Sequence, residues 1–142
     1  MKNFEFYIEE GKVKKCSKDM ELVKSLVNDA IERKKLIELM DINFMSKIIY
    51  ENSYDVLRNI LDALLLIDGY KSYSHEASIS YLKKYDVDEL FIIKIDKFRY
   101  ERNSSKYYGK NIDIERAIEI KEFLPKFILK IKNISSEINE LL

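Results

Sequence analysis

The chain has 142 residues, 46% of them apolar and 35% charged, with 25 basic and 25 acidic side chains. The apolar content excludes a disordered chain, and the charge balance excludes a global basic field that would pull the whole molecule onto nucleic acid. This length predicts one domain, residues 1–142. The single cysteine, Cys16, excludes an internal disulfide and fits a reducing compartment. The longest apolar stretch, Ala63 to Ile67, is far below the ~20 residues that span a bilayer, so we expect a cytoplasmic chain with no membrane partner.

The first 16 residues differ from the rest of the chain. Apolar and polar residues alternate from Phe4 to Ile8, and a turn-like segment follows. This alternation predicts a short hairpin or an extended arm packed on the body. Ser17 is suited to cap a first long helix at about residues 18–39, where apolar residues recur at helical spacing.

Two further helices are expected between about residues 42 and 84. Asp41 can cap a long helix at about residues 42–67, whose apolar stripe is broad enough to pack against more than one neighbour. A loop should follow, and then a short helix at about residues 75–84, capped by Ser72 or Ser74.

The remaining chain predicts two more helices. One should run from about residue 87 to the 104–108 region, and the last should cover about residues 113–140. Pro125 falls inside the last helix, where it removes a backbone donor and predicts a kink or a break. The predicted fold is therefore an all-α, up-and-down bundle of about four to five helices with a short N-terminal arm or hairpin.

The segment "DKFRYERNSSKYYGKN", at residues 96–111, gathers polar side chains at the end of one predicted helix. At 3.6 residues per turn, Arg102 continues the apolar line of Ile95 and Phe98. Twenty lysines accompany only five arginines, a lysine-rich composition typical of thermophiles, so the pair Arg99 and Arg102 stands out. Arginine offers a planar, bidentate fork that lysine lacks. The simpler interpretation is a solvated last turn whose cations offset the negative helix end.

Two stretches resemble the HEPN domain family, in particular its small stand-alone archaeal and bacterial members. They are "RNSSKYYG" (Arg102 to Gly109) and "YENSYDVLRNILDALLLIDGYKSYSHEASISYL" (Tyr50 to Leu82). The resemblance implies a bundle of about five helices that forms a homodimer. In that family, an arginine, a polar residue, three further residues and a histidine meet from both protomers in a cleft that cleaves RNA in the toxin members. A small nucleotidyltransferase encoded next door is a common partner, as antitoxin.

This sequence departs from the family motif at one position. Arg102 matches the arginine and Asn103 the polar residue, but Tyr107 stands where the histidine is expected. A tyrosine, with a pKa of about 10, is a poor base at neutral pH, although it can donate a hydrogen bond or stack on a nucleobase. Loss of general acid–base help typically lowers a rate by ~10²–10⁴-fold. The only histidine is His75, which is expected to be a packing residue or, less simply, a catalytic substitute.

Three functions follow as hypotheses. The first is nucleotide or RNA binding at a homodimer cleft, within a toxin–antitoxin pair. The second is a metal-independent ribonuclease, and the third is a non-enzymatic dimeric interaction module, in which the tyrosines serve packing. No cofactor or metal site is expected. The catalytic set would be Arg102, Asn103 and Tyr107, and the binding set would be Arg99, Arg102, Asn103, Lys106, Tyr107 and Tyr108.

Overall fold

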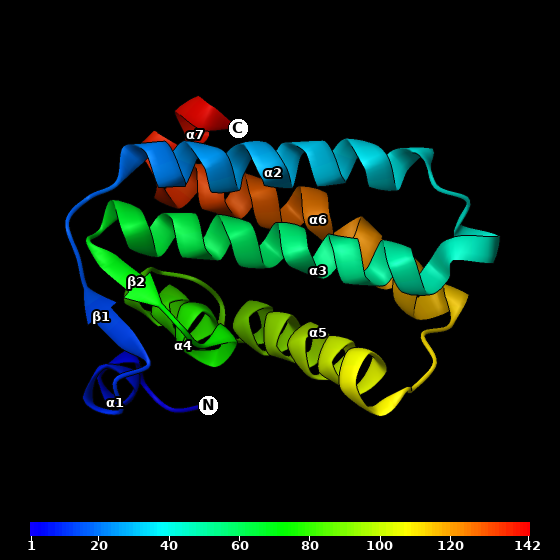
Figure 1. Ribbon diagram of the computed structural model, residues 1–142, viewed down its shortest axis with the longest axis horizontal. Coiled ribbons are helices and arrows are strands. Elements are labelled where there is room, and N and C mark those ends of the chain that lie inside the picture. The colour runs from blue at the N-terminus through cyan, green and yellow to red at the C-terminus, as the bar shows by residue number, and fades with distance from the viewer.

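Long helices make up most of the chain in a computed structural model that describes residues 1–142. The elements, in chain order, are α1 (Phe4–Glu9), β1 (Val13–Lys15), α2 (Met20–Leu39), α3 (Ile42–Ile67), β2 (Tyr70–Ser72), α4 (His75–Ser80), a 3₁₀ turn (Tyr81–Lys84), α5 (Glu89–Tyr108), α6 (Ile114–Ile134) and α7 (Ser136–Leu141). The four longest helices run in alternating directions, and α3 contacts the other three (Figure 1). The predicted all-α class and up-and-down arrangement are confirmed.

Acidic side chains cap the first two long helices. Asp41 caps α3, as predicted, by accepting a hydrogen bond at 2.9 Å from a backbone N–H of the first turn. The prediction for the preceding helix is wrong, because Asp19 rather than Ser17 caps α2, through a 3.1 Å hydrogen bond. Aspartate caps as well as serine does, and its negative charge also suits the helix N-terminus.

The core forms around α3. Its broad apolar stripe is buried against several helices at once, and residues such as Tyr50, Leu57 and Leu65 are completely inaccessible to solvent. Burying one leucine side chain contributes roughly 1.5–3 kcal/mol, so this stripe supplies much of the driving force for folding. No helix, including α3, combines the length and the apolar character needed to cross a membrane.

The N-terminal segment is only partly as predicted. Residues 4–9 form a helix, capped by the Asn3 side chain, instead of an extended strand. The alternation of apolar and polar residues suggested a strand, but Phe4 and Tyr7 also share one face of a helix. On that face, Phe4 packs edge-on against Tyr81. The extended part is β1, which pairs antiparallel with β2. An arm therefore packs on the body, but its partner strand lies in the segment predicted as a loop.

Gly69 makes the connection from α3 into β2. Its φ of +86° lies in the left-handed region, which favours glycine. A Cβ atom at this position would also lie 3.2 Å from the carbonyl oxygen of Cys16. Gly69 accepts a hydrogen bond from the backbone N–H of Cys16 at 2.8 Å, so the close approach of the two segments extends the small sheet.

The last predicted helix is two helices, and the interruption is not at Pro125. Helix α6 continues through Pro125, whose side chain is exposed. The chain leaves helical geometry at Ser135, with φ −139° and ψ 109°, and the Ser135 side chain then caps α7. Of the kink or break predicted at Pro125, the break is therefore wrong. Local sequence signals a strained position, but the packing of Leu124 and Phe127 on either side keeps the helix continuous.

Candidate functional site

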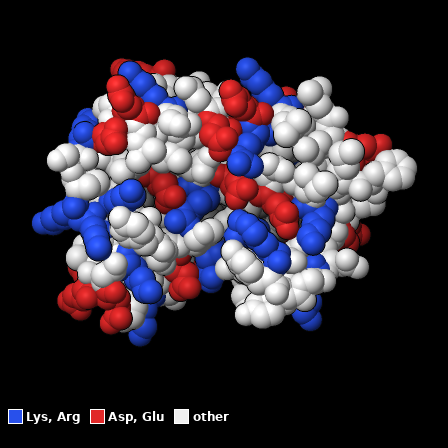
Figure 2. Space-filling model, viewed as in Figure 1, with Lys and Arg blue, Asp and Glu red and all other residues white.

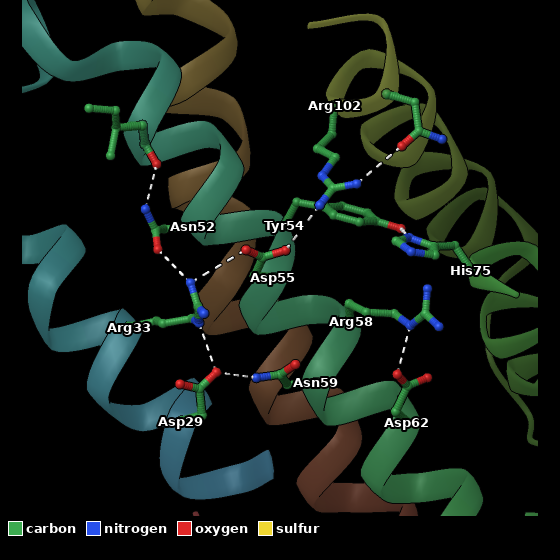
Figure 3. Close-up of polar contacts among 12 residues, drawn as sticks. Asp29, Arg33, Asn52, Tyr54, Asp55, Arg58, Asn59, Asp62, His75 and Arg102 are labelled. Atoms are coloured by element: carbon green, nitrogen blue, oxygen red, sulfur yellow. Dashed lines mark hydrogen bonds and ion pairs between the residues drawn. The ribbon is translucent and has the colours of Figure 1, made fainter. Parts of the chain in front are cut away.

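Arg102 turns into the bundle rather than toward solvent. Its side chain is only 8% exposed, which agrees with its place on the apolar line of α5. Its guanidinium carbon lies 5.5 Å from the ring centroid of Tyr54, and one nitrogen is 3.6 Å from Oδ1 of Asp55. A second nitrogen donates to Oδ1 of Asn103 at 3.4 Å, but Nε has no hydrogen-bond partner (Figure 3). The arginine is buried yet held only by long contacts.

Asp55 is shared between Arg102 and an arginine from a third helix. Its Oδ2 atom is 3.4 Å from a guanidinium nitrogen of Arg33, which reaches across from α2 (Figure 3). Arg33 is itself firmly held, since it donates to Asn52 at 2.8 Å and to Asp29 at 2.8 Å. The hydrogen bond from Arg33 lowers the pKa of Asp29 below its ordinary value. A continuous polar network thus joins α2, α3 and α5.

Tyr54 links Arg102 to the only histidine. The Tyr54 hydroxyl lies 2.9 Å from Nδ1 of His75, and the two rings are nearly parallel, with centroids 5.7 Å apart. Burial raises the pKa of Tyr54 above its ordinary value, and the nearby charges of Arg58, Arg99 and Arg102 only partly offset this. Because the phenol stays protonated, it can donate to Nδ1 of His75. The segment predicted to begin a short helix therefore brings His75 to the site.

A second arginine with a free donor lies one turn along α3. Arg58 donates to Asp62 at 2.7 Å, but its NH1 atom is buried and has no partner. Asp62 also accepts a hydrogen bond from Ser78 on α4 at 2.7 Å. Burial raises the pKa of Asp62, against the effects of Arg58 and Ser78, which lower it. The ion pair lies within α3, and the hydrogen bond from Ser78 to Asp62 ties α3 to α4 next to the Tyr54–His75 contact.

Arg99 is occupied by acidic partners. It donates to Asp96 at 2.7 Å and lies 3.6 Å from Glu76 on α4. Burial acts to lower the pKa of Arg99, but the hydrogen bond and charge of Asp96 outweigh it, so the pKa is raised. Arg99 therefore fastens α5 to α4, and its guanidinium is less available to a ligand than that of Arg102.

The last turn of α5 points the other way. Tyr107 and Tyr108 are 64% and 79% exposed, and Lys106 is exposed with its ammonium 5.8 Å from the Tyr107 ring centroid. Tyr100, two residues before Arg102 and therefore on the opposite side of α5, is also exposed. The predicted set thus divides: Arg99, Arg102 and Asn103 join the inner network, while Lys106, Tyr107 and Tyr108 lie on the outer surface.

The surface around the network has no dominant charge. Basic and acidic side chains are interspersed along the seam between α3 and the α4–α5 layer (Figure 2). Each guanidinium of the network lies near at least one carboxylate. A cavity of about 330 Å³, among α2, α3 and α6, is lined by none of these arginines. Attraction of an anion to this site would come from free N–H donors and not from net charge.

Several residues of the network were not among the predicted site residues. They are Arg33, Tyr54, Asp55 and Arg58. Tyr54 and Arg58 are four apart on one helical face, which is the only local signal in the sequence. No protein-family model, curated protein or solved structure matches the chain.

Proposed function

We propose that the chain binds a ribonucleotide phosphate, in single-stranded RNA or a free nucleotide, at the C-terminal half of α5. The observation that carries this proposal is the unpartnered Nε of Arg102, a side chain more than nine-tenths buried. A buried donor left without an acceptor costs about 1–3 kcal/mol, which a bound acceptor would recover. A phosphate oxygen suits this role because the guanidinium fork matches phosphate bidentately.

The exposed end of α5 supports RNA as the source of that phosphate. Tyr107 and Tyr108 present their rings to solvent beside Lys106 and Lys110, both exposed. Stacking of a base on an aromatic ring contributes about 1–3 kcal/mol and tolerates any sequence. A strand whose phosphate contacts Arg102 would thus find aromatic surfaces within the next turn or two of the helix.

The proposal includes a homodimer, as the resemblance to HEPN proteins implies. On the outer face of α5, the exposed residues Ile93 and Tyr100 are seven residues apart, the spacing of a helix that pairs with another helix. Light scattering tests this part. We expect Tyr100→Glu to convert a dimer to monomers, whereas Tyr73→Glu, at an exposed tyrosine outside α5, should leave the dimer intact.

A titration tests the binding itself. We would measure the affinity for a fluorescently labelled oligouridylate of about eight nucleotides, a length within the usual site size, and for AMP and ATP as competitors. Arg102→Met is expected to weaken binding at least tenfold. Arg116→Met, at an exposed arginine on α6, is the matched control and should change affinity less than twofold. Equal affinities for the two variants would refute the proposal.

A ribonuclease is the second candidate, and the position of His75 favours it. Cleavage by 2′-hydroxyl attack breaks the bond from phosphorus to the 5′ oxygen and needs one proton removed and one supplied. Imidazole is suited to both steps near neutral pH, and His75 reaches the site through Tyr54. Gel analysis of RNA with the wild type and with Arg102→Met tests it, since a nuclease should lose activity in the variant. A dimeric interaction module without ligand is the third candidate, and a nucleotidyltransferase partner would be tested by co-purification.

A further inference from the structure

We propose that Arg33 on α2 is a positioning residue for the phosphate site, because it holds the Asp55 carboxylate away from Arg102. This inference rests on the proposed function, and it adds that contacts inside the bundle set the affinity of Arg102 for phosphate. Asp55 is the internal competitor of the phosphate, since a carboxylate and a phosphate use the same guanidinium fork. Arg33 decides how strongly that competitor engages Arg102.

The two oxygens of the Asp55 carboxylate face different arginines. Its Oδ1 faces Arg102 at 3.6 Å and its Oδ2 faces Arg33 at 3.4 Å, both well beyond the ~2.7–2.9 Å of a close charge-assisted hydrogen bond. Neither arginine therefore has a tight pair with Asp55. Arg102 in particular keeps Nε free, and its one hydrogen bond, to Asn103, is long.

Arg33 can hold this intermediate position because its other contacts fix it. It donates to Asp29 at 2.8 Å from Nε and to Asn52 at 2.8 Å from NH1, so the guanidinium plane is anchored on both sides. Asn59 donates to Asp29 at 2.6 Å and completes the support (Figure 3). The anchor is rigid, whereas the Arg102 end of the network is loose.

The consequence of losing Arg33 follows from this asymmetry. Without it, Asp55 has one cation left in reach, and a carboxylate beside a buried arginine gains most by pairing closely with it. A close Asp55–Arg102 pair would occupy the donors that the phosphate needs. The affinity for phosphate should therefore fall, although no residue that contacts the ligand has changed.

Substituting lysine separates this effect from a loss of charge. Arg33→Lys keeps the positive charge, but a single ammonium cannot hold Asp29, Asn52 and Asp55 at once as the planar fork does. If Arg33 acted only through its long-range field, the lysine variant would bind like the wild type. If it acts through Asp55, the lysine variant should weaken binding much as Arg33→Met does.

The test is a double-mutant cycle with the labelled oligouridylate. Couplings within one polar network correspond to about two- to 150-fold in affinity, and because the contacts of Asp55 are long, we expect Arg33→Lys to weaken binding about three- to tenfold. In an Asp55→Asn background, where the competitor is gone, the same change should have an effect below twofold. Lys34→Met, a charge loss at the next position of α2, is the control and should change affinity less than twofold.

Two results would overturn the inference: wild-type affinity in Arg33→Lys, or an equal loss with and without Asp55→Asn. A second measurement needs no ligand, so it stands even if RNA does not bind and the proposed function fails. Urea unfolding of Arg102→Met, Asp55→Asn and their combination gives the coupling between Arg102 and Asp55. That coupling should at least double in the Arg33→Lys background, and an unchanged coupling would reject the role of Arg33.

Discussion

The guanidinium of Arg102 on α5 lies over the ring of Tyr54 on α3, with 5.5 Å between the guanidinium carbon and the ring centroid. Tyr54 is 1% exposed, so this cation–π contact is sheltered from water. Such contacts contribute about 0.5–1 kcal/mol at exposed sites and about 2 kcal/mol or more when desolvated. The pair therefore stabilises Arg102 against α3 while leaving its polar contacts long.

Substitutions at Tyr54 should separate the ring from its hydroxyl. Tyr54→Phe keeps the surface under Arg102 and removes only the contact with His75, so we expect a loss of about 0.5–1.5 kcal/mol in the free energy of unfolding and unchanged RNA affinity. Tyr54→Leu also removes the ring and should lose more stability and weaken binding. Urea denaturation and the oligouridylate titration check both, and identical behaviour of the two variants would contradict the role of the ring.

The resemblance of residues 102–109 to the HEPN motif, which belongs to the proposal, gives a gain-of-function prediction at Tyr107. Tyr107→His introduces a group that exchanges protons near neutral pH, one turn beyond Asn103, so we expect RNA cleavage to appear or increase. Tyr108→His, on the adjacent exposed position, is the matched control and should not cleave. Product gels at several pH values provide the measurement. Unchanged activity in a folded Tyr107→His variant would count against this position as catalytic.

Asp68 should make stability sensitive to acid. Burial raises the pKa of Asp68, but hydrogen bonds from Tyr81, Tyr85 and Lys84 outweigh it, so the pKa in the folded state lies below its ordinary value. A lowered pKa stabilises the fold above the unfolded-state pKa of about 3.9 and loses that contribution as the pH falls through the folded-state pKa. We therefore expect stability to decline below about pH 4.

Replacing Asp68 tests the assignment of that decline. Asp68→Asn should lower the free energy of unfolding at pH 7 and flatten its fall below about pH 4. Asp86→Asn, at an exposed acid between the 3₁₀ turn and α5, should leave the profile as in the wild type. Urea denaturation at a series of pH values checks this. A profile equally steep in Asp68→Asn would assign the acid sensitivity to other carboxyl groups.

Pro125 offers a stabilising substitution. Because α6 is continuous through Pro125, alanine there should restore a backbone donor and remove the clash with the preceding turn. Proline is about 3 kcal/mol less favourable than alanine inside a helix, and the lost rigidity of the unfolded chain offsets about 0.4–1 kcal/mol. We expect Pro125→Ala to raise the melting temperature, while exposed Lys126→Ala changes it little. A fall in the melting temperature would mean that α6 relies on the proline.

The Tyr50 hydroxyl is expected to stabilise the α3–α5 contact. Tyr50 is fully buried, and its hydroxyl donates to Glu101 at 2.7 Å. Burial, followed by the hydrogen bond and charge of Glu101, raises the pKa of Tyr50. Tyr50→Phe leaves the carboxylate short of a donor and should lower the free energy of unfolding by about 1–3 kcal/mol. Tyr73→Phe, at an exposed tyrosine, should be neutral, and equal values for the two would contradict this role.

Local signals in the sequence were enough to predict the positions of most helices in the bundle. The two helices on either side of Asp41 and the stop of α5 at Gly109 follow from apolar spacing, a side-chain cap and a left-handed glycine, all of which act within a few residues. Two of the misses, at residues 4–9 and at Pro125, are places where packing outweighed the local signal. The packing of Phe4 against Tyr81 favours a helix at residues 4–9, and buried residues on either side of Pro125 keep α6 continuous.

The sequence by itself determined that Arg102 extends the apolar stripe of α5. Only the tertiary structure decided that Arg102 meets Tyr54 and Asp55, and that Arg33 shares the same carboxylate. The physical reason is that sequence patterns act over a few residues, whereas these contacts join residues far apart in the chain. Helical periodicity shows which face of α5 turns inward, but which side chains meet that face depends on how α2, α3 and α5 pack, and the contacting residues lie tens of positions apart in the chain.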